Sequence, residues 1–209
     1  MNQSYNYRLF QHMPGSQKIR TALFGGTFNP LHNGHVAIAR SVIEQGLADE
    51  VWLLVTPCNP WKKGQKLLDD HLRYDMVAQA VEDMDGVSVS DYEFSLPKPS
   101  YTADTLRNIS TDFPDRRFIL TIGADNWVKF HDWREADYIL DNYPIIVYPR
   151  KGHDIEFPLP DGIKLLECPL VDVSSTQLRR MVRNGKPINK LVPASIARTI
   201  QELNLYTNN

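Results

Sequence analysis

The sequence predicts an α/β fold, a Rossmann-like doubly wound parallel sheet with a small helical part at the C-terminus. Short apolar runs alternate with segments of helical periodicity over residues 20–148, a pattern typical of strands linked by crossover helices. The last third ends instead in two helical segments. Of the 209 residues, 42% are hydrophobic, which is enough to bury one full core.

The apolar runs that we expect to form strands cover 20–24, 51–55, 87–90, 118–122, 144–148 and 163–166. The expected helices cover 34–45, about 70–82, a stretch after Ser100, about 175–184 and about 194–203. Asn33 is available as N-cap of the first helix, and Gly185 suits the position that ends the helix over 175–184. Residues 1–17 are polar and lack periodicity, so we expect a loose N-terminal extension followed by a single domain over 18–209.

The amino-acid composition limits the classes of partner that we expect for this protein. Lys and Arg total 23 against 25 Asp and Glu, a net charge of −2 that gives no global reason to expect a nucleic-acid or membrane partner. No apolar stretch approaches the ~20 residues of a membrane span, so the cytoplasm is the expected location. Cys58 and Cys168 lack neighbours at metal-ligand spacing, so we expect no protein-held metal. The sequence leaves a homo-oligomer open.

The most informative segment is 25–35, GGTFNPLHNGH, between a predicted strand and a predicted helix. Backbone N–H groups and the positive end of the helix dipole meet at such a junction, so an anion is expected there. The glycines allow close backbone approach to a nucleotide. His32 and His35 are near enough to direct two ring N–H donors at one phosphate and to stabilise charge that builds during its transfer.

A second anion-binding segment is predicted at 173–179, VSSTQLR. Its hydroxyl residues are good N-caps for the following helix, and Arg179, one turn into that helix, could clamp a triphosphate. Other polar residues follow predicted strands: Lys62 in a Pro-rich loop, Thr102 at a helix start, and Trp133, whose ring could stack on a flat ligand. A helix start that favours anions suits a carboxylate better than a neutral amide.

The segment 25–35 resembles the signature of the HxGH nucleotidyltransferase superfamily, and its full form resembles that of bacterial nicotinate-nucleotide adenylyltransferases. The segment 173–179 is similar to the Ser-Ser-Thr-x-Ile-Arg motif of that family, and 99–106, PSYTADTL, to its Pro-Ser-Tyr-Thr-x-x-Thr-Leu motif. The chain departs from the family at Asn29, where Asp is usual, at Trp61, where His is usual, and at Lys151, where Pro is usual.

The resemblance implies transfer of AMP from ATP, bound with Mg²⁺, to nicotinate mononucleotide, giving deamido-NAD and pyrophosphate in NAD biosynthesis. It implies catalytic roles for His32, His35, Arg179 and Lys62. It implies nucleotide contacts from Gly25, Gly26, Thr27, Phe28, Gly34, Gly123, Asp125, Arg150, Ser174, Ser175 and Thr176. It implies contacts to the pyridine-bearing acceptor from Tyr101, Thr102 and Trp133.

Two alternatives stay open at this point. The acceptor could be nicotinamide mononucleotide or phosphopantetheine, or the reaction could join a cytidylyl donor to an alcohol phosphate, because the sister families share the His-x-Gly-His loop. The chain could instead be a nucleotide sensor that uses the loop only to bind. Formation of product from ATP distinguishes the sensor from the enzyme.

Overall fold

The computed structural model describes residues 18–57, 67–155, 159–169 and 171–207. Its strands are β1 (Ile19–Gly26), β2 (Glu50–Val55), β3 (Val87–Ser90), β4 (Arg116–Gly123), β5 (Ile145–Tyr148) and β6 (Ile163–Leu165). Its helices are α1 (Asn33–Glu44), α2 (Asp70–Val81), α3 (Thr102–Asp112), α4 (Ala124–Trp127), α5 (Ala136–Asn142), α6 (Ser175–Arg183) and α7 (Ala194–Glu202), with short 3-10 turns η3 (Tyr92–Ser95) and η4 (Phe130–Asp132).

The six strands form one parallel sheet in the order β3-β2-β1-β4-β5-β6. This is the doubly wound Rossmann order, so the predicted fold is confirmed. The order reverses between β1 and β4, and the register there pairs Ala22 with Ile119. In such sheets the crevice beyond the carboxyl ends of the strands at the reversal is the usual ligand site.

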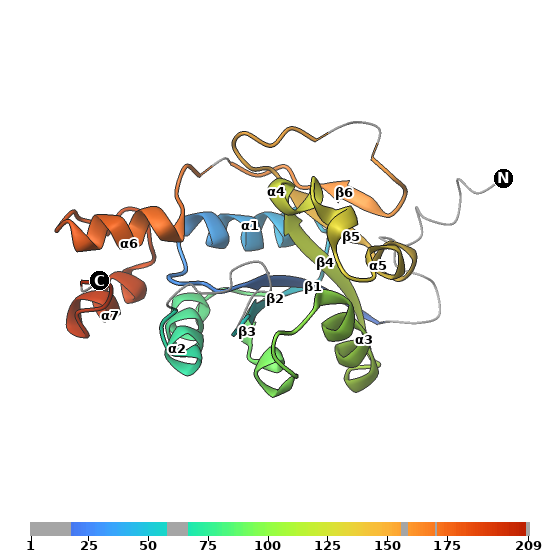
Figure 1. Cartoon of the computed structure of the whole chain (residues 1–209), viewed down its shortest axis with the longest axis horizontal. Coiled ribbons are helices and arrows are strands. Elements are labelled where there is room, and N and C mark those ends of the chain that lie inside the picture. Colours follow the sequence, from blue (N-terminus) through green and yellow to red (C-terminus); the bar gives the residue numbers. More distant parts are fainter. Residues whose placement is uncertain (1–17, 58–66, 156–158, 170, 208–209) are drawn as a thin grey trace.

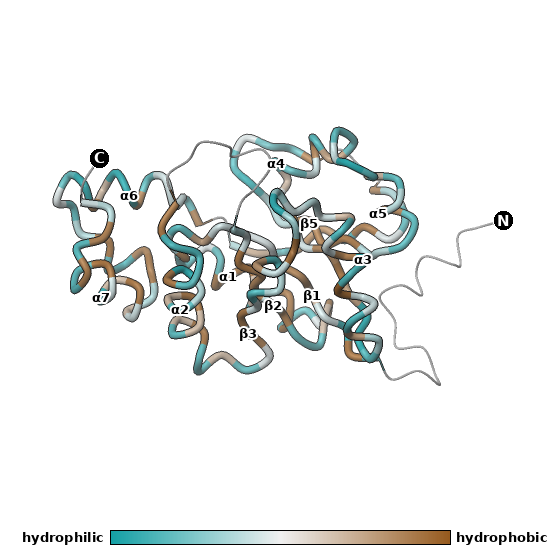
Figure 2. Tube along the Cα trace, turned by 60° about the horizontal axis from the view of Figure 1, so that its bottom comes forward, coloured by the Kyte–Doolittle hydropathy of each residue, from teal (hydrophilic) through white to brown (hydrophobic). Residues whose placement is uncertain are grey.

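Alternate residues of β1 face opposite sides of the sheet and divide the core in two. Ala22 and Phe24 pack with apolar residues of α1, α2, α6 and α7, whereas Leu23 packs with those of α3 and α5. Accordingly, α1 and α3 lie on opposite sides of the sheet, and α6 and α7 stand together at one end of the molecule (Figure 1). The apolar stretches are concentrated in the central strands, and the outer turns are polar (Figure 2).

The predicted helix ends agree with the structure in most places. Gly185 follows α6 with φ +64°, the left-handed conformation expected just after a helix. The predicted N-cap of α1 was wrong by one position: His32 is the N-cap, and the Asn33 side chain instead donates to the carbonyl of Lys190 at 3.1 Å.

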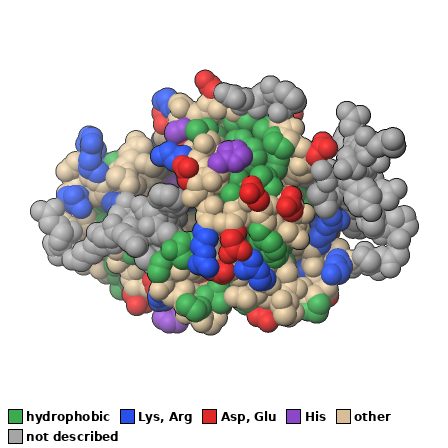
Figure 3. Space-filling model, turned by 45° about the vertical axis from the view of Figure 1, so that its right-hand side comes forward, with side chains coloured by type: hydrophobic (Ala, Val, Ile, Leu, Met, Phe, Trp, Pro, Cys, Tyr) green, Lys and Arg blue, Asp and Glu red, His purple; other side chains and the backbone are tan. Residues whose placement is uncertain are grey.

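Two further features concern the charges on the surface and the length of the helices. On the face shown in Figure 3, Lys and Arg side chains are interspersed with Asp and Glu. Among the helices that the described residues form, none has the length and apolar character needed to cross a membrane. The predicted boundary between an extension and a domain at residue 18 stays a prediction, because residues 1–17 lie outside the described part of the chain.

Candidate active site

The loop between β1 and α1 is held from within by Phe28. Its backbone has φ +41°, and its buried ring meets the rings of Phe24 and His35 edge-on at centroid distances of 5.8 and 5.1 Å. A side chain at Gly26 would place its Cβ 2.9 Å from the Phe28 ring. Gly26 is therefore required by the packing of this ring. Phe28 acts as a support for His35 rather than as an open surface.

His32 and His35 are brought together at the start of α1. Their rings are stacked, with centroids 3.6 Å apart and an interplanar angle of 18°. The backbone N–H of His32 donates to Nδ1 of His35 at 3.2 Å, so the proton of a neutral His35 ring lies on Nε2. Both residues are buried.

The electrostatic surroundings keep His32 uncharged. Burial, and then the positive charge of Arg150, lower its pKa from 6.5 to about 4. His32 Nδ1 is buried and has no hydrogen-bond partner in the structure. The His32 ring is thus neutral at neutral pH, and an arriving anion would find its Nδ1 without a hydrogen-bond partner.

Because Gly34 has no side chain, it leaves room for the His32 ring. A Cβ at this position would lie 3.0 Å from Nδ1 and 3.1 Å from Cε1 of His32. The glycine of the His-x-Gly-His motif therefore serves the stacked geometry of the histidines directly. Gly34 also lines the first cavity, so its contact with a nucleotide stays a prediction.

The two predicted anion-binding segments meet in space. Ser175 Oγ donates to the carbonyl of Pro30 at 2.9 Å, and Arg179 Nη1 donates to the carbonyl of Asn29 at 2.8 Å. Arg179 Nη2 also donates to Thr176 Oγ1 at 3.2 Å, and burial lowers the pKa of Arg179. Ser174 caps α6 by accepting from the N–H of Gln177. These bonds tie α6 to the loop that follows β1.

Both segments line a cavity of about 190 Å³. Among its lining residues are His32, Gly34, His35, Arg150 and Ser174. It therefore combines the N-termini of α1 and α6 with a guanidinium, an arrangement that suits a polyphosphate. Cys168 also lines this cavity, and burial raises the pKa of its thiol.

A second cavity of about 110 Å³ lies at the switch point, beside β1, β2 and β4. Gly25 and Gly26, at the end of β1, line it together with Thr102 and Trp133. Two of the three residues predicted to contact the acceptor substrate therefore share one cavity with these glycines. Tyr101 does not line this cavity. The guanidinium carbon of Arg134 lies over the Tyr101 ring, 4.8 Å from the centroid of that ring. Tyr101 and Arg134 instead line a separate third cavity.

Tyr148, at the end of β5, lines both cavities and forms part of the wall between them. Its hydroxyl accepts a hydrogen bond from Arg150 at 3.3 Å, and burial raises its pKa. Arg150 Nε also lies 3.6 Å from Asp125 Oδ1. A Cβ at Gly123 would collide with Asp125 Oδ1 and approach the Tyr148 ring to 3.0 Å. Gly123 and Asp125 thus support this wall and line neither cavity.

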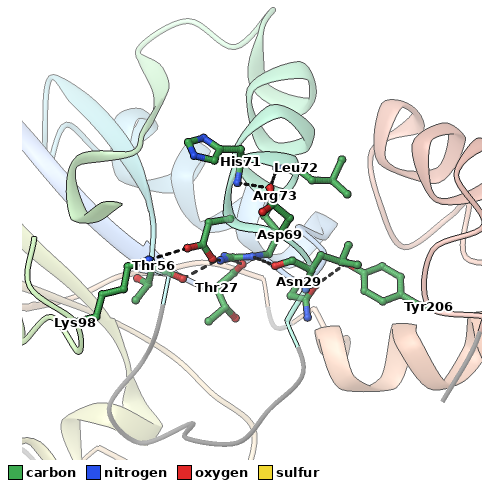
Figure 4. A network of polar contacts seen from close by, with 11 residues as sticks. Thr27, Asn29, Thr56, Asp69, His71, Leu72, Arg73, Lys98 and Tyr206 are labelled. Atoms are coloured by element: carbon green, nitrogen blue, oxygen red, sulfur yellow. Dashed lines mark hydrogen bonds and ion pairs between the residues drawn. The ribbon is translucent and has the colours of Figure 1, made fainter. Parts of the chain in front are cut away.

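Arg73 is fully buried in α2, and no functional role was predicted for it from the sequence. Its guanidinium donates to the carbonyls of Thr27 and Thr56 at 2.6 and 3.1 Å and pairs with Asp70 (Figure 4). In this way it joins the loop after β1 to the end of β2. An arginine on the same helical face as Met76 and Val77 was the available signal, because a charge on an apolar stripe requires internal partners.

Five further predicted site residues line neither cavity: Thr27, Phe28, Ser175, Thr176 and Arg179. Thr27 presents its backbone carbonyl to Arg73. Lys62, together with Trp61, lies outside the described residues. Over the described ranges, no group of three or more His, Cys, Asp or Glu side chains is arranged to hold a metal ion.

Comparison with known proteins identifies the family. Residues 23–181 match the cytidylyltransferase-like family model. The chain is 41% identical to the "Probable nicotinate-nucleotide adenylyltransferase" of Bacteroides fragilis, covering 88% of this chain and 93% of the relative. It is 39% identical to the protein of the same description from Flavobacterium johnsoniae, covering 90% and 99%.

A structural neighbour supports the fold. Plasmodium falciparum nicotinic acid mononucleotide adenylyltransferase, solved in complex with NaAD, superposes with a TM-score of 0.76 at 21% identity, covering 91% of this chain and 98% of the neighbour. The matched model spans most of the sheet and both anion-binding segments, and the relatives match over nearly their whole length. The chain therefore belongs to the cytidylyltransferase-like nucleotidyltransferases and, among them, to the nicotinate-nucleotide adenylyltransferase family.

Proposed function

We propose that this protein transfers the adenylyl group of ATP to nicotinate mononucleotide, releasing pyrophosphate and forming deamido-NAD. One observation carries the proposal: the stacked histidines and the start of α6 line one cavity, and Gly25 and Gly26 lie beside a second cavity that contains Thr102 and Trp133. The donor triphosphate occupies the first cavity, and the acceptor ring the second. The names of the close relatives agree with this reaction.

The chemistry requires no protein nucleophile. An oxygen of the acceptor's phosphate attacks the α-phosphorus of ATP, a new P–O bond forms, and the bond to the bridging oxygen breaks as pyrophosphate leaves. His32 and His35 donate ring N–H groups to the phosphate oxygens on which negative charge grows. Arg179 and Arg150 offset the charge of the triphosphate, and Ser174, Ser175 and Thr176 present the N-terminus of α6 to it.

Magnesium enters with the substrate. The described residues provide no cluster of three protein ligands, whereas Mg²⁺ commonly binds through substrate phosphates and water. We therefore propose that ATP is bound as its Mg²⁺ complex. Lys62, in the loop after β2, is proposed to contact a phosphate, a role carried over from the motif alone.

Release of pyrophosphate from Mg-ATP, followed with nicotinate and nicotinamide mononucleotides side by side, tests donor and acceptor together. Product with nicotinate mononucleotide, and much less with the amide, is expected. His35→Ala should lower turnover by about 100-fold or more while the protein still folds, since loss of one transition-state donor typically costs that much. His71→Ala, an exposed histidine of α2 outside both cavities, is the matched control. Full turnover in His35→Ala would remove the histidine role.

A further inference from the structure

Three buried polar atoms beside the second cavity make no hydrogen bond of good geometry within the fold. Glu93 Oε2, Ser100 Oγ and Thr121 Oγ1 have no hydrogen-bond partner, and all three residues line this cavity. Their side chains are buried, with relative exposures of 6%, 7% and 2%. Because buried polar atoms in proteins are almost always paired, three orphans around one space indicate a polar ligand that fits among them.

Glu93 is fixed in place by its surroundings. It belongs to the 3-10 turn η3, immediately after β3, and its Oε1 accepts a hydrogen bond from Thr105 Oγ1 of α3 at 2.8 Å. This bond orients the carboxyl group, and Oε2 makes no hydrogen bond of good geometry. No lysine or arginine is among the described residues that line the cavity. Burial raises the pKa of Glu93, and the neighbouring side chains of Thr105, Thr56 and Ser100 oppose that rise.

Different parts of the cavity wall favour opposite charges. At one side α3 begins at Thr102, where unpaired backbone N–H groups and the helix dipole favour negative charge. Elsewhere it holds the carboxyl group of Glu93 and the ring of Trp133, two groups that favour positive charge. A ligand that carries a carboxylate and a cation on one flat ring would complement both.

We propose that Glu93 recognises the positive charge of the N-ribosylated pyridinium ring of the acceptor, while the start of α3 receives the ring carboxylate. The inference rests on the proposed function, because it assigns a group of the proposed acceptor to a residue. Glu93 is then a specificity-determining residue: it selects a pyridinium over a neutral ring of the same shape. The reacting phosphate is at the other end of the acceptor, so the effect is on binding rather than on the chemical step.

The test compares two ligands and two variants by direct binding without ATP. Nicotinate mononucleotide has a cationic ring, whereas the 3-carboxyphenyl C-riboside 5′-phosphate has the same shape and no ring charge. Wild type should bind the first about tenfold more tightly or better, as expected for one desolvated charge interaction. Glu93→Gln keeps the size and the acceptor for Thr105, and it should reduce that preference to about twofold or less.

Kinetics gives a second readout. In Glu93→Gln the KM for nicotinate mononucleotide should rise about tenfold, with kcat and the KM for ATP within about twofold of wild type. Glu82→Gln, at the exposed end of α2, is the matched control and should behave as wild type. A structural role alone would move the melting temperature without altering the preference between the two ligands.

The outcomes separate this inference from the proposed function. If wild type releases pyrophosphate with nicotinate mononucleotide but binds both ligands equally, or if Glu93→Gln retains the wild-type preference, Glu93 does not recognise ring charge. If wild type neither binds nicotinate mononucleotide nor releases pyrophosphate with it, the proposed function fails as well. Because the ligand comparison in wild type needs no variant, a poorly folded Glu93→Gln protein would not prevent a decision.

Discussion

Arg179 and Asn29 lie 150 positions apart in the chain, yet a guanidinium nitrogen of Arg179 donates to the backbone carbonyl of Asn29 at 2.8 Å. The contact fixes the first turn of α6 against the loop that carries His32 and His35. Because the same guanidinium also bonds Thr176, its plane is oriented before any nucleotide arrives. The Arg179 side chain therefore both supplies a positive charge and holds the loop between β1 and α1 in place.

Arg179→Ala should lower kcat/KM for ATP by about 10- to 100-fold, since a hydrogen bond to a charged group contributes about 1.5–3 kcal/mol. Arg179→Lys should recover only part of the loss, because an ammonium cannot reproduce the planar fork that joins Asn29 and Thr176. Steady-state kinetics measures both. Arg180→Ala, at the next and exposed position of α6, is the control and should be silent. Equal kinetics in Arg179→Ala and Arg180→Ala would contradict the assignment.

The low pKa of His32 predicts a loss of stability in acid. The unfolded chain takes up a proton near pH 6.5, whereas the folded protein does so only near pH 4. The stability from the neutral ring is therefore fully present above pH 6.5 and is lost as the pH falls toward 4. At about 1.4 kcal/mol for each pH unit between the two pKa values, the total is about 3 kcal/mol.

Denaturant unfolding at several pH values between 4 and 7 measures this effect. His32→Asn cannot titrate, so its free energy of unfolding should fall less steeply than that of wild type over this interval. The difference between the two curves isolates His32 from the other titrating groups. Parallel curves would mean that His32 has an ordinary pKa in the folded protein.

Gly34→Ala should impair catalysis without unfolding the protein. Its Cβ would approach the His32 ring to 3.0 Å, so the ring must shift by a few tenths of an ångström from its stacked position over His35. Alanine is favoured over glycine in helices by up to about 1 kcal/mol, so α1 itself should not weaken. We expect turnover to fall by about tenfold or more with a melting temperature within a few degrees of wild type. Unchanged turnover would show that the stacked geometry is not required.

The order of elements could be predicted because each signal is local. Apolar runs predict the strands, and N-cap residues and helical periodicity predict α1, α2, α3, α6 and α7. Helix α5 was not predicted. It has seven residues, too few for a clear period, and it begins after Glu135, whose φ of +56° is uncommon for a residue with a side chain.

The site divides in the same way. The two predicted anion-binding segments are recognisable because glycines and hydroxyl residues act on their own neighbouring backbone. The partners of Arg73 and Glu93 could not be predicted, since they come from distant elements: Arg73 bonds Thr27 and Thr56, and Glu93 accepts from Thr105. Tyr101 shows the converse, because a motif residue can have its side chain outside the cavity that its neighbour lines.

Asn29 stands where the family usually has Asp, and the structure predicts the effect of restoring it. Asn29 Oδ1 accepts from the hydroxyl of Tyr206 at 2.8 Å, whereas Nδ2 is buried without a partner. Asn29→Asp keeps the acceptor and removes the orphan donor. The charges of Arg179 and Arg73 act on the Tyr206 hydroxyl, so both guanidinium groups are near enough to offset a carboxylate at this position.

We therefore expect Asn29→Asp to raise the free energy of unfolding by about 1 kcal/mol, measured by denaturant titration at pH 7. Tyr206→Phe removes the hydroxyl donor and should lower it by a similar amount. If Asn29→Asp destabilises the protein, the two guanidinium groups do not compensate for burial of the charge.

Substitution of Arg73 tests whether its guanidinium group holds the loop after β1 against α2 and the end of β2. Its side chain is fully buried, and its guanidinium joins the loop after β1, the end of β2 and Asp70, whose other oxygen accepts from Lys98 at 3.2 Å. Arg73→Met leaves three carbonyls, those of Thr27, Thr56 and Leu68, and an oxygen of Asp70 without their donor, so the free energy of unfolding should fall by about 3–5 kcal/mol. Lys98→Met removes only the exposed member of the network and should cost less than about 1 kcal/mol. Equal losses in the two variants, measured by denaturant unfolding, would show that Arg73 does not anchor the loop after β1.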